Sequence, residues 1–504
     1  MPAEQNFLSL SRLGIDTNNE TVLFIHKDCH ILLAEGVYSH PRVKVSCGNI
    51  SFVASVNQVR GNRLLKPGEA GISEHMWKKY GLSAGDKLTV SHLDPLDSLS
   101  FVRSKVFGHR LNGMQLSQII ADIADDRYSN IHISAFISAC AARGMTVEET
   151  IELTRSMVAC GETIDWGKPV IADKHCIGGL PGNRTTPIIV AIVAACGLTM
   201  PKTSSRAITS PAGTADMMEV LTPVDLDVRA MRRVVEQEGG CIVWGGSVSL
   251  SPADDILIGV ERALEIDSEG QLTASVLSKK IAAGSNHLIL DIPVGKTAKI
   301  RSFEDAELLS GLLKAVASAF HLKTEIIMSD GSQPVGRGIG PALEARDVLL
   351  VLNNSPLAPQ DLKTKAVQLA GALLDLAGKS LKGDGARLAL DTLESGAAWS
   401  KFQRICEAQG GFREPPVANI RHPLVADRSG IVRSVDNRLL AKLAKLAGAP
   451  GAPEAGADYL VRIGDEIEAG RELVILHARS KAELHYALEY AAIHDPVVEI
   501  GEMN

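Results

Sequence analysis

The sequence predicts an α/β protein of several domains. We expect a helical domain and an α/β domain with a central mixed sheet, placed between a β-rich N-terminal domain and a C-terminal α+β domain similar to a barrel sandwich. Three observations lead to this fold class. The 504 residues are enough for roughly three domains. Apolar and polar residues alternate in short runs near the N-terminus, and strand-like runs alternate with helical ones further along the chain.

Residues 1–98 are expected to form the N-terminal β-rich domain. The segments TVLFIH, RVKVSCG, ISFVASV and KLTVSHL alternate apolar with polar residues, and glycine or asparagine separates them. This alternation is typical of strands with one buried face.

Residues 99–167 are expected to be helical, with residues from about 252 to 283 joining the same domain. Four apolar residues have the spacing of one helix face: Leu116, Ile119, Ile120 and Ile123. A second helix is predicted to begin at Thr146, which forms a capping box with Glu149, and to stop at Gly161.

Residues 168–423 are expected to form the α/β domain. Strand, glycine turn and helix alternate through PVIADKH, TTPIIVAIVAACG, CIVWGG, SVLSKKIAAG, HLILDIPVG and TEIIMSD. Active sites of such sheets lie at the carboxyl ends of the strands. The proline-rich EPPVANIRHP is interpreted as a connector to the last domain, residues 424–504.

The last domain is expected to hold the strands GIVRSV and YLVRIG, separated by the loop GAPGAPEAGA. Its GDEIEAGREL turn resembles a turn of biotinyl and lipoyl carriers. The domain contains no Met-Lys-Met, so a carrier role is not expected.

Composition narrows the class of partner. A net charge of −7 with well-mixed signs disfavours binding to nucleic acids and membrane surfaces, which leaves small molecules and a second copy of the chain. The longest apolar run, Pro187–Leu198, is shorter than the ~20 residues of a spanning helix, and the N-terminus lacks a signal pattern. We therefore expect a cytoplasmic protein.

The eight cysteines show no CxxC spacing and no zinc-like pairing with histidine. Neither a disulfide framework nor a bound metal is expected. They are Cys29, Cys47, Cys140, Cys160, Cys176, Cys196, Cys241 and Cys406.

The segment DKHCIGGLPGNRTT, residues 173–186, links a predicted strand to a predicted helix. Free N–H groups and the dipole at a helix start favour an anion, and glycines allow the backbone to approach it closely. Lys174 adds a positive charge, and Thr185 and Thr186 add hydroxyl donors. On these residues alone, a phosphate cradle and an ordinary strand-to-helix turn both stay open.

A second segment, KTSSRAITSPAGTADMMEVL (Lys202–Leu221), is rich in hydroxyl side chains and contains Arg206. Hydroxyl-rich segments are often solvated loops. Loops that follow consecutive parallel strands, however, meet at the same edge of the sheet. The two segments are therefore predicted to surround one anion.

The motifs KHCIGGLPGN, SSRAITSPAGTADMMEVL and LTASVLSKK resemble the signatures of the thymidine phosphorylase and pyrimidine-nucleoside phosphorylase family. The SRAITS motif and the extra N-terminal domain are most similar to a long branch of that family. This branch includes the archaeal AMP phosphorylases and bacterial proteins named thymidine phosphorylase of the second type. The resemblance spans nearly the whole chain.

The resemblance implies a homodimer or higher homo-oligomer, in which a helical domain is hinged to an α/β domain. It also implies phosphorolysis: thymidine and inorganic phosphate give thymine and 2-deoxyribose 1-phosphate. Phosphate is then the co-substrate, and no further cofactor is expected. The nucleophile is phosphate itself, so the reaction needs no covalent enzyme intermediate.

The resemblance assigns residues to each side of this reaction. The phosphate side receives Lys174, Gly179, Thr186, Ser204 and Thr214, while Cys176 stands where the family commonly has serine. The base side receives His175, Ser275, Lys279 and, more loosely placed by its spacing, Arg262. In the nucleotide branch the substrate contacts are Gly179, Ser205, Arg206, Ala207, Ile208, Thr209, Ser210, Thr214, Ser275 and Lys299, and the proton donor is Asp267.

The chemistry fits these assignments. Lys279 and Ser275, one helical turn apart, would bind the base oxygen as it becomes negative, and a protonated His175 or Asp267 would neutralise it. The residues alone also allow a structural histidine at 175, a turn aspartate at 267 and a solvated helix face at Lys279 and Lys280.

Three rival functions remain open. A nucleoside 5′-monophosphate such as AMP or CMP is an alternative substrate that would give ribose 1,5-bisphosphate, with Arg206 seating its phosphate. A phosphoribosyltransferase would need magnesium, and the sequence shows no acidic pair placed to hold it. A non-catalytic nucleotide sensor is the third.

Overall fold

A computed structural model describes residues 7–18, 20–29, 42–93, 95–207, 210–266 and 268–502. The chain divides into two compact units, Met1–Arg143 and Gly144–Asn504. No helix in the described part of the chain is long and apolar enough to cross a membrane.

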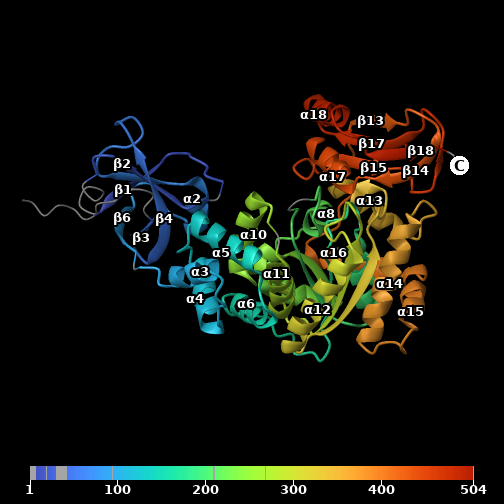
Figure 1. Ribbon diagram of the computed structural model, residues 1–504, viewed down its shortest axis with the longest axis horizontal. Helices are drawn as coiled ribbons and strands as arrows, with labels where there is room; N and C mark the ends of the chain where they lie inside the picture. Colours follow the sequence, from blue (N-terminus) through green and yellow to red (C-terminus); the bar gives the residue numbers. More distant parts are fainter. Residues whose placement is uncertain are drawn as a thin grey trace, which may run out of the picture. The chain divides into compact units, whose positions relative to one another are not determined.

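The first unit contains a closed barrel with strand order β1-β5-β2-β4-β3-β6 (Figure 1). Its strands are β1 (Leu8–Arg12), β2 (Val22–His26), β3 (Arg42–Cys47), β4 (Ile50–Val59), β5 (Glu69–Ile72) and β6 (Lys87–His92). Alternate apolar side chains, among them Leu23, Ile25 and Val45, fill its interior. The four strands predicted from alternation are thus confirmed.

Helices complete the first unit: α2 (Glu74–Tyr80), α3 (Ser98–Val106), α4 (Gly113–Ala124) and α5 (Asn130–Arg143). The side chain of Asn112 caps α4 by accepting the N–H of Gln115, and all four residues of the predicted apolar stripe are buried. Helix α4 therefore begins and faces the core as its sequence dictates.

The second unit begins with α6 (Val147–Ala159), whose capping box joins Thr146 and Glu149 as predicted. A parallel sheet follows. Its strands are β7 (Ala172–Cys176), β8 (Met200–Ser204), β9 (Gly240–Trp244), β10 (His287–Val294) and β11 (Lys323–Asp330). Strands β11-β10-β7 form one ladder and β8-β9 another, and a parallel bridge between Ile171 and Thr199 links the two.

The expected mixed sheet is wrong for these strands. Each pairing that the structure describes among β7–β11 is parallel. The reason is the connection between successive strands, because each passes through at least one helix that returns the chain to run in the same direction.

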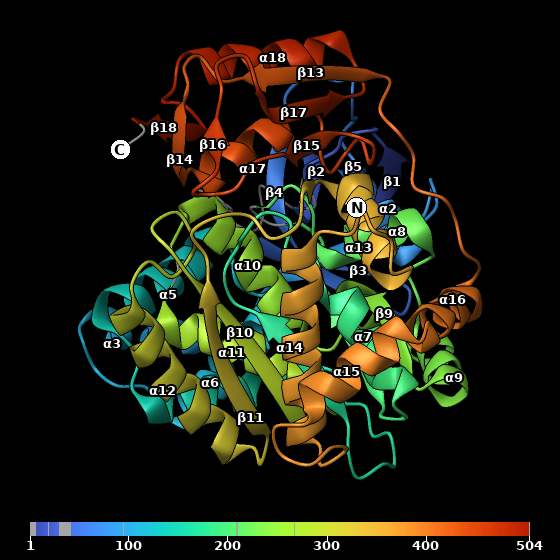
Figure 2. The same ribbon diagram turned by 90° about the vertical axis from the view of Figure 1, so that its right-hand side faces the viewer.

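Helices cover both faces of the sheet (Figure 2). Leu288, Leu290 and Ile292 of β10 pack into a core with α11 and α12, whereas Ile289 packs into the core around α7 and α14. The helices are α7 (Thr185–Ala195), α8 (Thr214–Leu221), α9 (Val228–Glu238), α10 (Pro252–Leu264), α11 (Glu269–Ala282), α12 (Phe303–Ala319), α13 (Pro341–Leu352), α14 (Gln360–Leu376), α15 (Gly385–Glu394) and α16 (Ala397–Gln409).

The C-terminal part of the second unit holds two small sheets, ordered β12-β15-β17-β13 and β16-β14-β18. Their strands are β12 (Gly338–Ile339), β13 (Ile420–Val425), β14 (Gly430–Val435), β15 (Gly456–Tyr459), β16 (Glu466–Ile467), β17 (Glu472–Ala478) and β18 (Val498–Gly501). Two helices, α17 (Asn437–Leu446) and α18 (Lys481–Ala492), pack on them.

The predicted strand YLVRIG is wrong beyond Tyr459, where β15 ends. The N–H of Arg462 is donated to the Asp465 carboxylate and that of Ile463 to the side chain of Gln333. These two backbone N–H groups therefore form hydrogen bonds with side chains, and not with a neighbouring strand.

Candidate active site

Strand β7 carries three consecutive polar residues, Asp173, Lys174 and His175, and ends at Cys176. Lys174 is only 1% exposed, and its ammonium donates to the hydroxyl of Thr185 at 2.9 Å. Burial lowers the pKa of this lysine, and Asp291 on the neighbouring strand β10 opposes that effect. The ammonium of Lys174 thus lies beneath the first turn of α7.

The loop between β7 and α7 is tightly packed. Gly182 has φ of +67°, and a Cβ there would lie 2.3 Å from the carbonyl oxygen of Val335. The carbonyl of Gly178 accepts the N–H of Lys299 at 3.1 Å. Gly179 is exposed, and Thr186 is buried in the first turn of α7. Lys299 and Gly179, both assigned by resemblance, therefore belong to the same loop cluster.

Arg184 joins this loop to the second hydroxyl-rich segment. Its guanidinium donates to the hydroxyl of Thr214 at 2.9 Å and to the carbonyl of Ala212 at 3.0 Å. Its Nε donates to Glu344 of α13 at 2.5 Å. Burial raises the pKa of Glu344 to about 7, against the opposing effect of Arg184. The prediction that the two loops meet is confirmed.

Ser204 ends strand β8 and is 9% exposed. Its hydroxyl is buried and has no hydrogen-bond partner among the residues that the structure describes. A buried hydroxyl without a partner is costly, so this atom is a natural contact for a bound ligand. Ser210, further along, donates to the carbonyl of Ala212 at 2.9 Å.

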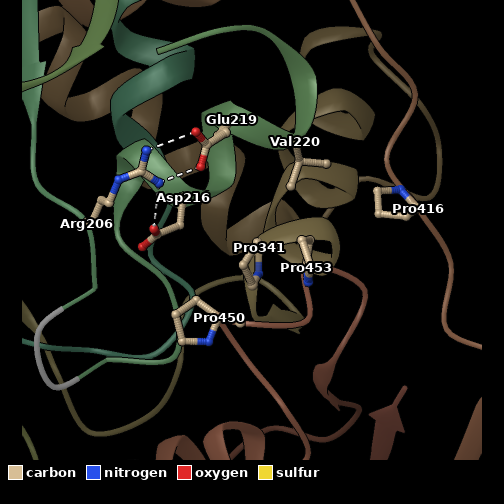
Figure 3. A pocket seen from close by; sticks show the side chains of 9 residues that line it. Arg206, Asp216, Glu219, Val220, Pro341, Pro416, Pro450 and Pro453 are labelled. Atoms are coloured by element: carbon tan, nitrogen blue, oxygen red, sulfur yellow. Dashed lines mark hydrogen bonds and ion pairs between the residues drawn. The ribbon is translucent and has the colours of Figure 1, made fainter. Parts of the chain in front are cut away.

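Arg206 is already paired (Figure 3). Its guanidinium donates twice to Glu219, once at 2.9 Å, lies 3.5 Å from Asp216 and stacks over the ring of Trp244. The hydrogen bonds to Glu219 raise its pKa. Asp216 also accepts the N–H groups of Ala207 and Gly213, which places a carboxylate at the start of α8. In the described structure, this guanidinium is thus paired with carboxylates of α8.

A cavity of about 490 Å³ lies beside this pair (Figure 3). Its described lining combines Arg206, Asp216, Glu219 and Val220 with four prolines and a glycine. Two carboxylates face one guanidinium here, so the charge is unfavourable for phosphate. The residues assigned to the phosphate side, Lys174, Thr186, Ser204 and Thr214, lie instead on β7 and β8 and at the starts of α7 and α8.

The charges of several ammonium groups act on His175. Burial, followed by the charges of Lys280, Lys202 and Lys174, lowers its pKa well below the ordinary value. In the protein without substrate, His175 is therefore neutral at neutral pH. The protonated form expected from the sequence is not the one that these surroundings favour.

Helix α11 carries Ser275 and Lys279 one turn apart. The ammonium of Lys279 lies 2.5 Å from Asp254 and 3.8 Å from Asp255, both in α10. Burial lowers the pKa of Lys279, but these carboxylates raise it above its ordinary value overall. Lys280 is 3% exposed and paired with Asp173, so a solvated helix face is wrong for this residue.

Some assigned residues lie elsewhere. Arg262 is exposed in the last turn of α10. Asp267, Ile208 and Thr209 lie outside the described residues. Within the described ranges, no group of three or more His, Cys, Asp or Glu side chains is placed to hold a metal ion.

Sequence reasoning missed the charged residues beneath the site: Asp173, Lys202, Asp291 and Lys365, together with Arg184 and Glu344. Lys365 lies 3.1 Å from Asp291, whose carboxylate also accepts the hydroxyl of Ser329 at 2.5 Å. A charged residue inside an apolar strand, as in MPKTS and LILDIPV, was the available signal.

Comparison with known proteins identifies the family. A family model described as "Glycosyl transferase family, a/b domain" matches residues 168–399, and one described as "Glycosyl transferase family, helical bundle domain" matches residues 99–161. A protein of Chelativorans sp. (strain BNC1) named "Putative thymidine phosphorylase" is 54% identical over 99% of this chain and 98% of its own. The chain belongs to this glycosyl transferase family.

A second relative of this glycosyl transferase, from Polaromonas sp. (strain JS666), carries the same name and is 55% identical over 98% of this chain and 97% of its own. Anthranilate phosphoribosyltransferase from Thermus thermophilus shares the fold, with a TM-score of 0.51 and 18% identity over 61% of this chain and 98% of that one. The protein is thus a glycosyltransferase-type enzyme with a helical bundle domain and an α/β domain.

Proposed function

We propose that this glycosyl transferase catalyses the phosphorolysis of thymidine. An oxygen of inorganic phosphate forms a bond to C1′ of the sugar, and the bond from C1′ to the base nitrogen breaks with its electron pair going to the base. A proton neutralises the base, which gives thymine and 2-deoxyribose 1-phosphate. The relatives' printed name supports the substrate, and the site geometry supports the phosphate.

The observation that carries the proposal is the hydroxyl of Ser204, which has no hydrogen-bond partner among the described residues and lies at the start of one of two joined loops. An oxygen of phosphate would accept a hydrogen bond from this hydroxyl at the carboxyl edge of the sheet. The start of α7 adds the positive end of a helix dipole. Lys174 would act from beneath through Thr185, whose hydroxyl it already contacts.

The base would lie against α11. Ser275 and Lys279 share one helix face, and the ammonium of Lys279 is held by Asp254 at 2.5 Å. A base oxygen that becomes negative in the transition state would accept a hydrogen bond from this ammonium, which stays paired with Asp254. We propose that His175 contributes a neutral N–H donor and that Asp267 is the alternative source of the proton.

The surroundings of Arg206 favour thymidine over a nucleoside 5′-monophosphate as the substrate. A nucleoside 5′-monophosphate needs a further anion contact, and Arg206 is occupied by Glu219. Thymidine is therefore the preferred candidate substrate.

We also propose that phosphate is the sole co-substrate and that the protein is a homo-oligomer that binds neither nucleic acid nor membranes. Light scattering of the purified protein tests the assembly.

Incubation with thymidine and phosphate, followed by chromatography of the released base, tests the function. Thymine should appear only when phosphate is present, and EDTA should leave its rate unchanged. AMP and CMP serve as parallel substrates. Faster cleavage of either, or no cleavage of thymidine, would reject thymidine as the substrate. Loss of activity with EDTA would show that the reaction needs a divalent metal ion, contrary to this proposal.

A further inference from the structure

Asp173 lies at the centre of a buried cluster of charges. Its carboxylate is fully buried and accepts donors from several segments of the chain. Oδ1 lies 3.2 Å from the ammonium of Lys202 in β8 and accepts the backbone N–H of Lys174 at 2.7 Å. Oδ2 lies 3.0 Å from the ammonium of Lys280 in α11 and accepts the hydroxyl of Ser285 at 3.4 Å. One carboxylate therefore ties together β7, β8, α11 and the turn before β10.

A buried cluster of charges such as this one adds little net stability to a fold. Lys202, Lys280 and Asp173 are all nearly inaccessible to solvent, and two ammonium groups share one carboxylate. Desolvation of buried charges offsets much of their attraction, so apolar residues of similar size often stabilise a protein as well. What an ion cluster supplies in addition is a fixed geometry between the elements that it joins.

One of the elements that this cluster joins is α11, the helix that carries the proposed base site. Ser275 and Lys279 share one face of α11, and Lys280 points about 100° away from Lys279 around the helix axis. Val276 and Leu277 pack against the apolar side chains of β10, but such contacts are non-directional. The contact of Lys280 with Asp173, at 3.0 Å, instead joins one specific position of α11 to one specific position of the sheet.

The other end of this contact lies on the strand that leads into the first proposed phosphate loop. Asp173 directly precedes Lys174 and His175, and Lys202 lies two residues before Ser204 on β8. A shift of α11 would therefore move Ser275 and Lys279 relative to both His175 and Ser204.

We propose that Asp173 and Lys280 are positioning residues that set the orientation of the Ser275–Lys279 face of α11 relative to the strands that lead into the phosphate loops. This inference rests on the proposed phosphorolysis. Neither residue contacts the reacting atoms. Their contact brings C1′ of the sugar within reach of the phosphate, because the base is bound by α11 and the phosphate by the ends of β7 and β8.

The variant Lys280→Met tests this role. It leaves Asp173 paired with Lys202, so no charge is left buried without a partner. The value of kcat/KM for thymidine should fall by about 10- to 100-fold, as expected when reacting groups are misplaced, while the KM for phosphate changes by less than about threefold. Lys280→Arg keeps the charge and should restore part of the loss. Unchanged kinetics, or a KM for phosphate that rises by about tenfold or more, would overturn the proposal.

Lys401→Met is the matched control. Lys401 of α16 pairs with Glu238 at 3.0 Å, and both side chains are largely buried. Each variant removes one of two cations paired with a buried carboxylate, so both should change the Tm to a similar extent, but Lys401→Met should leave the kinetics unchanged. A similar loss of activity in the control would show that stability, and not position, limits turnover.

Hydrogen exchange separates the inference from the proposed function. Amides of residues 269–282 should exchange at least about tenfold faster in Lys280→Met than in wild type, and at the wild-type rate in Lys401→Met. Unchanged exchange in α11 would reject the positioning contact, whatever the enzyme's substrate. A wild type that releases no thymine would reject the proposed function, and faster exchange would then still establish that Lys280 fixes α11.

Discussion

The guanidinium of Arg184 donates to the hydroxyl of Thr214 at 2.9 Å, and its Nε donates to the carboxylate of Glu344 at 2.5 Å. Arg184 directly precedes α7, Thr214 begins α8, and Glu344 lies in the first turn of α13. One side chain thus fixes the relative position of the two proposed phosphate loops. A buried carboxylate in turn fixes that side chain.

Replacing Arg184 should weaken phosphate binding and destabilise the protein. In Arg184→Ala at pH 8, we expect the free energy of unfolding to fall by about 3 kcal/mol, because Glu344 stays buried without its partner. We expect the KM for phosphate to rise by about tenfold as the loop of Thr214 loses its anchor. The double variant Arg184→Ala/Glu344→Gln should regain stability without regaining phosphate affinity. Recovery of both would show that the effect on phosphate was one of folding.

Ser204→Ala should separate binding from stability. Its hydroxyl has no partner within the described structure, so its removal should change the free energy of unfolding by less than about 0.5 kcal/mol. A hydrogen bond to a charged phosphate would be lost, which should raise the KM for phosphate by about tenfold. Chemical denaturation and initial rates measure the two effects. A destabilised variant with normal phosphate affinity would contradict the assignment of Ser204.

Glu344 should make stability depend on pH. Burial raises its pKa from 4.5 to about 7. A carboxyl whose pKa is raised by folding favours the folded state while protonated, so its contribution is complete below pH 4.5 and is lost as pH rises to about 7. Relative to Glu344→Gln, the wild type should lose about 3 kcal/mol of unfolding free energy across that range. Urea titrations at several pH values measure this loss, and parallel curves for the two proteins would refute it.

Gly182 and Gly179 form a matched pair for the first loop. Both have positive φ, but a Cβ at 182 would meet the carbonyl oxygen of Val335 at 2.3 Å, whereas no described atom lies within 4 Å of one at 179. Gly179→Ala should therefore cost about 1 kcal/mol, the usual penalty of a left-handed alanine. Gly182→Ala should cost clearly more. Equal losses of Tm would show that the close approach at 182 is not rigid.

Local patterns in the sequence predicted the elements that local forces decide. The stripe from Leu116 to Ile123 and the capping box at Thr146 were correct, because helix periodicity and caps depend on near neighbours in the chain. The strand predicted after Tyr459 failed since Gln333, distant in the sequence, takes the N–H of Ile463. The direction of the sheet strands likewise depends on their connections and not on the strands themselves.

The candidate site shows the same division. The two loops could be placed at one sheet edge from strand order alone, and the structure joins them through Arg184. The pairing of Asp173 with Lys280 spans more than a hundred residues, so no local pattern predicts it. The carboxylates that pair with Arg206 and Lys279 are likewise more than one helical turn away in the sequence, so no local pattern predicts these pairs. The sequence therefore predicted which residues are charged, but not which charges are already paired.

The most direct test is a crystal structure of the protein with phosphate and thymine. The account predicts a phosphate ion within hydrogen-bond distance of the Ser204 hydroxyl, at the carboxyl ends of β7 and β8, with thymine against Ser275 and Lys279. Phosphate bound only in the cavity beside Arg206, or no phosphate at Ser204 in a crystal that contains thymine, would contradict it.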